Sequence, residues 1–97
     1  MVLLRLKHMV TCNLNSISLG RVTDEELEEN IALQIRMLDN VISINQAPVP
    51  ESRMTSDKYR AIGLGTSGYH HYLVNHDIQW ESDEHIEVAD KLFENIA

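Results

Sequence analysis

The sequence of 97 residues contains a single cysteine, Cys12. One thiol cannot form a disulfide within the chain, and it cannot build a zinc site that needs several cysteines. Disulfide-rich secreted domains and cysteine-based zinc modules are therefore excluded. A lone cysteine fits a reducing compartment better than an oxidising one, so we expect a cytoplasmic protein.

Positive charge is also scarce. The chain has 8 Lys and Arg against 15 Asp and Glu, and its formal net charge is −7. Nucleic-acid surfaces need clustered basic residues against phosphates, and no such run occurs, so we expect no nucleic-acid partner. No apolar run approaches the roughly 20 residues that a membrane-spanning helix needs, so we expect no membrane association.

Aromatic residues make up only 5% of the chain, which leaves few large side chains to anchor a core. The hydrophobic share of 43% and the charged share of 24% are ordinary for a globular chain. The length allows one domain at most, with a core of limited size.

Hydrophobic periodicity predicts a first strand and a long helix. Extended structure is expected at about residues 10–14. Thr23 and Glu26 form a capping box, in which Thr23 caps the helix start and Glu26 reaches back. An amphipathic helix of about 20 residues should follow. Its apolar stripe recurs at spacings of four, four, three and four, through Leu27, Ile31, Ile35, Leu38 and Ile42.

The second half of the chain predicts a strand and two shorter helices. Pro48 and Pro50 should end the long helix, and residues 51–58 are expected to be a polar loop. Residues 59–65 should form a short strand that ends in glycines, before a turn and a helix to about residue 76. Another helix should begin after Ser82, with one apolar face made by Ile86, Ala89, Leu92, Phe93 and Ile96.

The expected order is strand, helix, strand, helix, helix, which is the rhythm of a parallel α/β architecture. Two strands cannot make a parallel sheet with both faces covered. The last helix also keeps its apolar pattern up to Ala97 without a capping signal. We therefore expect a fragment that is incomplete as an independent domain.

Residues 63–68 match the pattern G-x-G-x-x-G after a predicted strand. In a dinucleotide-binding module these glycines let backbone N–H groups approach a pyrophosphate. The acid that such a site needs about 20 residues later would be Asp83 or Glu84, and both lie at a predicted helix start. A tight strand-to-helix turn is the favoured interpretation, and a dinucleotide-binding module is kept as an alternative.

The histidines do not have metal-ligand spacing. His70 and His71 precede His76 by six and five residues, whereas helical zinc ligands stand three or four apart. His85 belongs to another predicted helix. We expect hydrogen-bonded or solvated histidines, with no metal site and no cofactor bound by this segment. No acid pair or nucleophile elbow is present.

Cys12 admits two interpretations from its own surroundings. A single cysteine in a predicted strand is most often an inert, buried small side chain. A redox role would need a second thiol, and this chain has none.

Three motifs favour the redox interpretation of Cys12. In the same order along the chain, they resemble segments of the large, catalytic subunit of ribonucleotide reductase. VTCNLNSISL at residues 10–19 resembles the family run V-T-C-N-L-G-S-I-N-L. Residues 37–42 and 48–51 resemble L-D-N-V-I … P-V-P-E, and residues 60–68 resemble R-x-I-G-L-G-x-x-G. The last helix also fits. The resemblance covers residues 10–97 and leaves residues 1–9 unmatched.

Two departures lie beside the cysteine. Asn15 stands where the family often has Gly, and Ser18 where it often has Asn. The first change is mild, because Asn tolerates the left-handed backbone that a Gly might adopt there.

The resemblance implies a fold and a chemistry. The family fold is a ten-stranded α/β barrel, in which Gly63 and Gly65 would belong to a barrel strand and its turn. The family replaces the ribose 2′-hydroxyl of a ribonucleotide with hydrogen, in deoxyribonucleotide biosynthesis for DNA replication. A cysteine thiyl radical abstracts the 3′ hydrogen, and two further cysteines supply the electrons and become a disulfide. Cys12 matches the second of these redox-active cysteines.

Other parts of that machinery have no counterpart in this sequence. The radical cysteine lies in an N-x-C-x-E run upstream of the position of Cys12, and only eleven residues precede Cys12 here. We therefore expect a fragment that is inactive alone and whose partner cysteine is not in this chain. Its expected partners are the rest of the large subunit, which could be separately encoded, a radical-generating small subunit and the ribonucleotide substrate. The complete enzyme would use a metal-containing small subunit or adenosylcobalamin as its radical generator.

Two further hypotheses remain open. The chain could be a truncated relic, or a small interaction module that reuses the segment. A complementing chain with the N-x-C-x-E run would favour a split enzyme instead.

Overall fold

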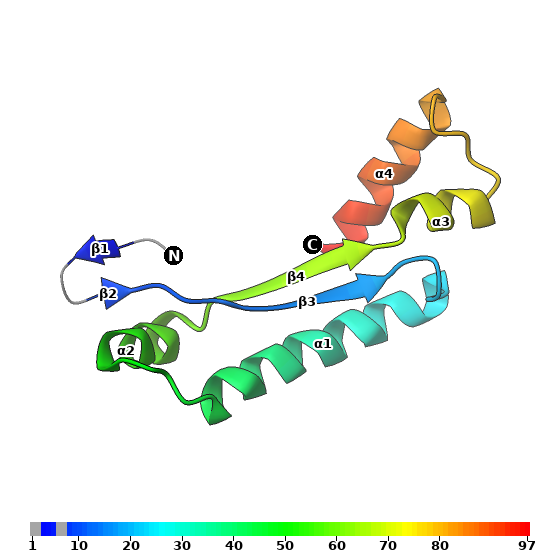
Figure 1. The fold of residues 1–97 in the computed structure, drawn as a ribbon. Helices are drawn as coiled ribbons and strands as arrows, with labels where there is room; N and C mark the ends of the chain where they lie inside the picture. The colour runs from blue at the N-terminus through cyan, green and yellow to red at the C-terminus, as the bar shows by residue number, and fades with distance from the viewer. Residues whose placement is uncertain (1–2, 6–7) are drawn as a thin grey trace. The chain divides into compact units, whose positions relative to one another are not determined.

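The computed structural model describes residues 3–5 and 8–97, and it contains both strands and helices (Figure 1). In chain order the elements are β1 (Leu3–Arg5), β2 (His8–Met9), β3 (Asn13–Ser18), α1 (Asp24–Ile44), α2 (Pro50–Tyr59), β4 (Ile62–Ser67), α3 (Tyr69–Asn75) and α4 (Asp83–Ile96).

The main strand pair joins β3 and β4, whose arrows run in the same direction in Figure 1. Parallel strands need a long crossover connection, and α1 with α2 supplies it here. Beyond the strand ends, the Leu19 N–H donates to the Ser67 carbonyl at 2.9 Å. β1 and β2 form a separate antiparallel pair. The predicted α/β class is confirmed.

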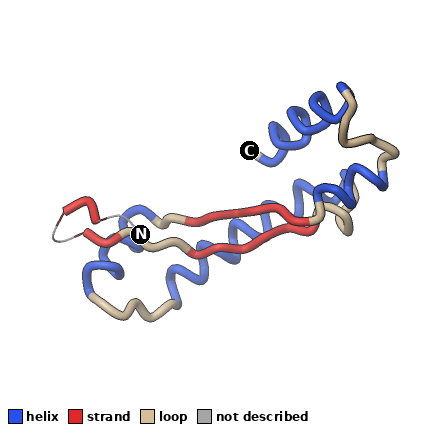
Figure 2. Tube along the Cα trace, turned by 45° about the horizontal axis from the view of Figure 1, so that its top comes forward, coloured by secondary structure: helices blue, strands red, loops and turns tan. Residues whose placement is uncertain are grey.

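The chain divides into two compact units. The first comprises residues 1–15 and 33–64, and the second comprises residues 16–32 and 65–97. β3, α1 and β4 each contribute a segment to both units. Figure 2 shows where the helices and strands lie along the chain trace.

α1 forms as its capping signal predicts. The Thr23 N–H donates to Glu26 Oε2 at 3.3 Å, which is the half of the capping box that Glu26 provides. Four of the five predicted stripe residues are buried, namely Leu27, Ile31, Leu38 and Ile42. Ile35 is 44% exposed, because it lies at the edge of the stripe.

The prediction of a polar loop at residues 51–58 is wrong, because these residues belong to α2. Val49 is extended, as the residue before a proline must be, and Pro50 takes the first helical position, where its missing N–H costs nothing. Ser52 and Thr55 are buried despite their polarity, since their hydroxyls donate to helix carbonyls at 3.0 and 2.8 Å. Arg60 ends the helix in a left-handed conformation with φ of 49°.

Both strands lie later in the chain than predicted. Extended structure was expected at residues 10–14, and β3 covers Asn13–Ser18; a strand was expected at 59–65, and β4 covers Ile62–Ser67. These strands contain Asn, Ser and Gly, which have low strand propensity. Pairing between β3 and β4 sets their position instead.

The second unit has its own apolar core and two shorter helices. Gly68 begins α3 with a positive φ of 68°. α4 begins after Ser82, as predicted, and the Ser82 hydroxyl caps it by accepting from the His85 N–H at 3.2 Å. The face predicted for α4 is only partly covered, since Ile86 is 69% exposed. Buried core residues of this unit are Ile17, Leu19, Leu27, Ile31, Tyr72, Leu73, Ile78 and Leu92. Within the described ranges 3–5 and 8–97, no helix is both long and apolar enough to cross a bilayer.

Candidate functional site

Cys12 lies one residue before β3, outside the strand in which it was predicted. Its thiol is exposed, and Sγ makes only a long contact of 3.6 Å with the Asn13 carbonyl oxygen. The interpretation of Cys12 as a buried core side chain is therefore wrong.

Cys12 lines a small pocket of about 210 Å³ within the first unit. Three segments contribute to it: the residues around Cys12, the end of α1 with the loop after it, and one face of α2. The lining residues are Thr11, Cys12, Asn13, Ile42, Asn45, Ala47, Pro48, Ser52, Arg53 and Ser56. Most of them are polar, and Cys12 is exposed among them.

Gly63 allows β4 to pass close beside the cysteine. A Cβ atom built on Gly63 would lie 2.5 Å from Leu14 Cδ2 and 3.6 Å from Cys12 Sγ. Gly63 and Gly65 both lie within β4, as the family resemblance implied. The absence of a side chain at Gly63 thus leaves room for Leu14 next to the thiol.

The segment in front of Cys12 is tied to α2, which lies against β2 (Figure 1). The Met9 N–H donates to Thr55 Oγ1 at 3.2 Å, and the hydroxyls of Thr11 and Ser56 lie 3.0 Å apart. Because residues 51–58 were predicted to be a loop, the contacts of Thr55 and Ser56 with this segment were not predicted. The sequence contains no local signal for them.

Arg53 stabilises the C-terminal end of α1, which has no basic residue in its last turn. Its guanidinium donates to the Asn45 carbonyl at 2.7 Å and, at 3.5 Å, to the carbonyls of Ile42 and Ser43. Nε also pairs with Asp57 at 2.9 Å. The unsatisfied carbonyls of a helix end favour a cation there. The uncapped end of α1 was the sequence signal for such a partner.

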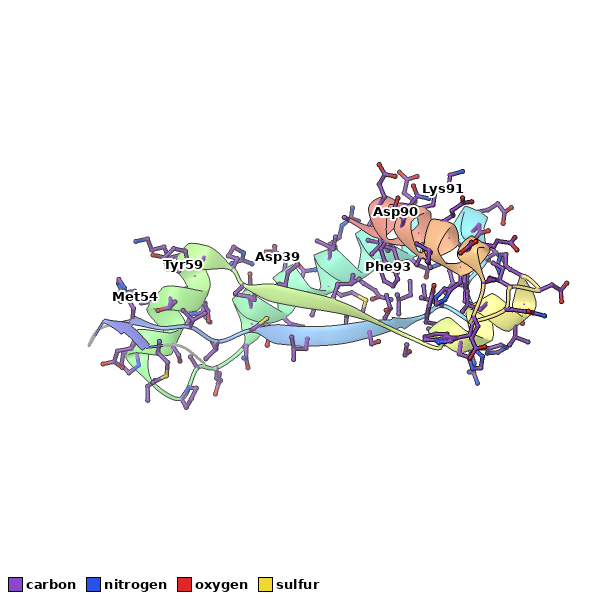
Figure 3. The ribbon with its side chains drawn as sticks, turned by 90° about the horizontal axis from the view of Figure 1, so that it is seen from above. Asp39, Met54, Tyr59, Asp90, Lys91 and Phe93 are labelled. Atoms are coloured by element: carbon purple, nitrogen blue, oxygen red, sulfur yellow. The ribbon has the colours of Figure 1, made fainter. Side chains whose placement is uncertain are left out.

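Arg60 makes a second contact with α1, at Asp39, the residue of that helix labelled in Figure 3. Arg60 Nε donates to Asp39 Oδ1 at 2.5 Å, and Nη2 donates to the Asp39 carbonyl at 2.7 Å and to Ser43 Oγ at 2.9 Å. The hydrogen bond from Arg60 Nε to the Asp39 carboxylate, together with the positive charge of Arg60, lowers the pKa of that carboxyl below its ordinary value. The pair joins α1 to the end of α2.

Replacing Asp39 by Asn should remove a pH-dependent contribution to stability. A lowered pKa in the folded state means that the contribution is present above the unfolded-state value of about 4, and is lost as the pH falls through the lowered folded-state value. The free energies of unfolding in urea of the wild type and of Asp39→Asn should therefore differ at pH 7. The difference should shrink as the pH falls below about 4 and vanish only below the lowered folded-state pKa. Asp90→Asn, at an exposed acid of α4 (Figure 3), is the control. A difference that stays constant from pH 7 to pH 2 would contradict the assignment.

The histidines make local hydrogen bonds in the second unit. His76 Nδ1 lies 2.8 Å from the Tyr72 carbonyl oxygen, and Nε2 lies 3.4 Å from Asp24 Oδ2. His85 Nδ1 lies 2.8 Å from the Trp80 carbonyl oxygen. The prediction of hydrogen-bonded histidines is confirmed for His76 and His85. Over the described part of the chain, no group of three or more His, Cys, Asp or Glu is placed to hold a metal ion.

The glycine pattern at residues 63–68 forms a strand and a turn. Its first two glycines lie in β4, and Gly68 begins a helix of only seven residues. Asp83 and Glu84 lie in the first turn of α4, which follows α3 rather than a strand. The interpretation as a strand-to-helix turn is confirmed, and the arrangement does not support the dinucleotide-binding alternative.

Comparisons with known proteins agree on one family. The model of the family described as "Ribonucleotide reductase, barrel domain" matches residues 2–97, so the match begins inside the segment that the sequence motifs left unassigned. Among curated relatives, the ribonucleoside-diphosphate reductase subunit alpha of Treponema pallidum is 50% identical over 90 residues, which cover 90% of this chain. The corresponding subunit of Helicobacter pylori strain 26695 is 41% identical over 87 residues, or 89% of this chain.

A relative from Mycobacterium tuberculosis bears a different name, vitamin B12-dependent ribonucleoside-diphosphate reductase. It is 36% identical over 92 residues, which cover 89% of this chain. The chain spans 11% of the length of the Treponema and Helicobacter relatives and 13% of that of the Mycobacterium relative.

Proposed function

Because the chain belongs to the ribonucleotide reductase barrel-domain family, we propose that it is part of the catalytic barrel of a ribonucleoside-diphosphate reductase alpha subunit. Within that barrel, Cys12 is one of the two cysteines that supply electrons to the substrate. The enzyme is an oxidoreductase that converts ribonucleotides to deoxyribonucleotides for DNA replication. Its cytoplasmic location stays a prediction.

The observation that carries the proposal is the position of Cys12. The cysteine of the VTCN run is exposed, lines a pocket and lies one residue before β3. Thiol–disulfide chemistry requires a sulfur that another sulfur can reach, and a cysteine packed in a core is inert. The exposure of Cys12 therefore supports a reactive role over a packing role.

The proposed step oxidises Cys12 and its partner thiol together. One S–S bond forms as two S–H bonds break, which releases two electrons and two protons. The electrons reduce the ribose at C2′, where the C–O bond breaks and a C–H bond forms. The hydroxyl leaves as water, so that one ribonucleotide and two thiols give one deoxyribonucleotide, one disulfide and one water.

The other functional groups belong to parts of the enzyme outside this chain. They are the radical cysteine with its Asn and Glu neighbours, the partner of Cys12 and the radical generator. The generator is either a metal-containing small subunit or adenosylcobalamin, and it supplies the oxidising equivalent that makes the thiyl radical. The described residues do not fit a metal-based generator, since no cluster of metal-binding side chains occurs among residues 3–5 and 8–97.

A single turnover should place Cys12 in a disulfide. The reduced complete enzyme is mixed with ribonucleoside diphosphate in the absence of external reductant, then alkylated and digested. Peptide mapping should find the peptide with Cys12 joined to a second cysteine peptide, at about one disulfide per deoxyribonucleotide formed. Cys12 that is fully alkylated after product has formed would refute the redox role.

A further inference from the structure

α2 presents three hydroxyls on one face, those of Ser52, Thr55 and Ser56, which we call the hydroxyl row. Thr55 is 2% exposed and donates to the Glu51 carbonyl at 2.8 Å. This bond alone would satisfy a threonine within a helix. Thr55 Oγ1 also accepts from the Met9 N–H at 3.2 Å, across 46 residues of sequence. Thr55 therefore connects α2 to the segment that leads to Cys12.

A second bridge lies two residues further along that segment. Thr11 Oγ1 and Ser56 Oγ are 3.0 Å apart, across 45 residues. Ser52, although 1% exposed, donates only to Val49 of its own helix entrance. Met9 and Thr11 are thus both held by the hydroxyl row immediately before the cysteine.

The residue after Cys12 is held as well, because Asn13 begins β3 and β3 pairs with β4. The backbone of Cys12 is therefore anchored on both sides, by α2 before it and by the strand pair after it. The side chain itself remains exposed and makes only the long contact with the Asn13 carbonyl. A fixed backbone with a free thiol is the result.

A disulfide needs such an arrangement, because its two Cα atoms must lie about 4.4–6.8 Å apart with a defined torsion. A cysteine backbone held in the geometry that the disulfide requires raises the effective concentration of its thiol toward the partner thiol. We propose that Thr55 is a positioning residue that holds the Cys12 backbone in place for disulfide formation. The proposal rests on the redox role of Cys12 given above.

The step that Thr55 supports is the oxidation of the two thiols to one disulfide, with two electrons passing to the ribose and the 2′-hydroxyl leaving as water. Thr55 takes no part in the transfer of electrons or protons. It acts only through the Met9 N–H, so its effect should be on the thiol–disulfide equilibrium and on kcat rather than on KM.

Thr55→Val keeps the shape of the side chain but removes the side-chain acceptor of the half-buried Met9 N–H. In the complete enzyme, the Cys12 disulfide is titrated with reduced and oxidised glutathione. The equilibrium constant for disulfide formation should fall roughly tenfold, the equivalent of about one hydrogen bond. kcat should fall with it while KM for the nucleotide stays the same, and Thr55→Ser should restore both values.

Gly68→Ala is the matched control, because it strains a left-handed backbone position in the other unit and so costs stability without touching the hydroxyl row. It should leave the glutathione equilibrium unchanged. Ser56→Ala, which removes only the bridge to Thr11, should lower the equilibrium constant about twofold to threefold. If Thr55→Val does not fold, Thr55→Ala, which also removes the acceptor of the Met9 N–H, takes its place, and an unchanged equilibrium constant there overturns the proposal.

The two proposals have separate signatures. A wild-type enzyme that forms no disulfide at Cys12 overturns the redox role, and the positioning role falls with it. A wild-type disulfide whose equilibrium constant is the same in Thr55→Val overturns the positioning role alone. An equal loss in Gly68→Ala also overturns it, since the effect would then follow stability.

Discussion

Replacing Cys12 by serine in the complete enzyme is expected to abolish sustained turnover and to leave nucleotide affinity nearly unchanged. The proposed role of the thiol is to deliver electrons after the substrate is bound, so substrate binding does not depend on it. Serine is close in size and has no redox chemistry. Because Cys12 is exposed, the new hydroxyl stays in contact with water, and the fold should not be penalised.

The measurement compares the dissociation constant of the nucleotide with the yield of deoxyribonucleotide per enzyme under excess reductant. Loss of the redox thiol should reduce the yield by several orders of magnitude, whereas one lost hydrogen bond changes a rate by about tenfold or less. Ser16→Ala, at an exposed position of β3, is the matched control and should retain turnover. Undiminished multiple turnover by Cys12→Ser would remove the redox assignment.

Leu73→Ala should give the largest loss of stability in the second unit. Leu73 lies in α3 and is 0% exposed, and its carbonyl also accepts from the Ile78 N–H at 2.9 Å. Truncation of a buried leucine removes its transfer free energy and leaves a cavity, which together cost about 2–5 kcal/mol. In a unit this small, a loss of that size is a large part of the total stability.

Urea unfolding followed by circular dichroism measures this loss. Val74→Ala is the control, since Val74 is the next residue of the same helix and is 59% exposed. Its substitution should change the free energy of unfolding by about 0.5 kcal/mol or less. Equal effects of the two substitutions would show that Leu73 is not part of a packed core.

The sequence alone predicted an element correctly where a local signal is compatible with only one structure. The capping box at Thr23 and the helix start expected after Ser82, each followed by apolar residues at helical spacing, placed α1 and α4 within one residue of their observed starts. The motif around Cys12 identified the family and the candidate residue without any coordinates. These signals depend on contacts within a few residues along the chain, so they can be read from the order of residues.

The tertiary structure decided what depends on long-range contacts. α2 was missed because its polar residues have no apolar stripe; Ser52 and Thr55 are nevertheless buried through their hydrogen bonds. The strand positions were shifted because pairing between β3 and β4 overrides weak local propensity.

The exposure of the Cys12 thiol has the same origin. The shift of β3 to Asn13–Ser18 leaves Cys12 outside the strand, and the bridges from α2 to Met9 and Thr11 hold it there. The sequence alone singled out Cys12 as the candidate residue and, through the family resemblance, suggested the redox chemistry proposed for it. Only the tertiary structure determined that its thiol is reachable and its backbone anchored, because both properties arise from groups more than 40 residues away.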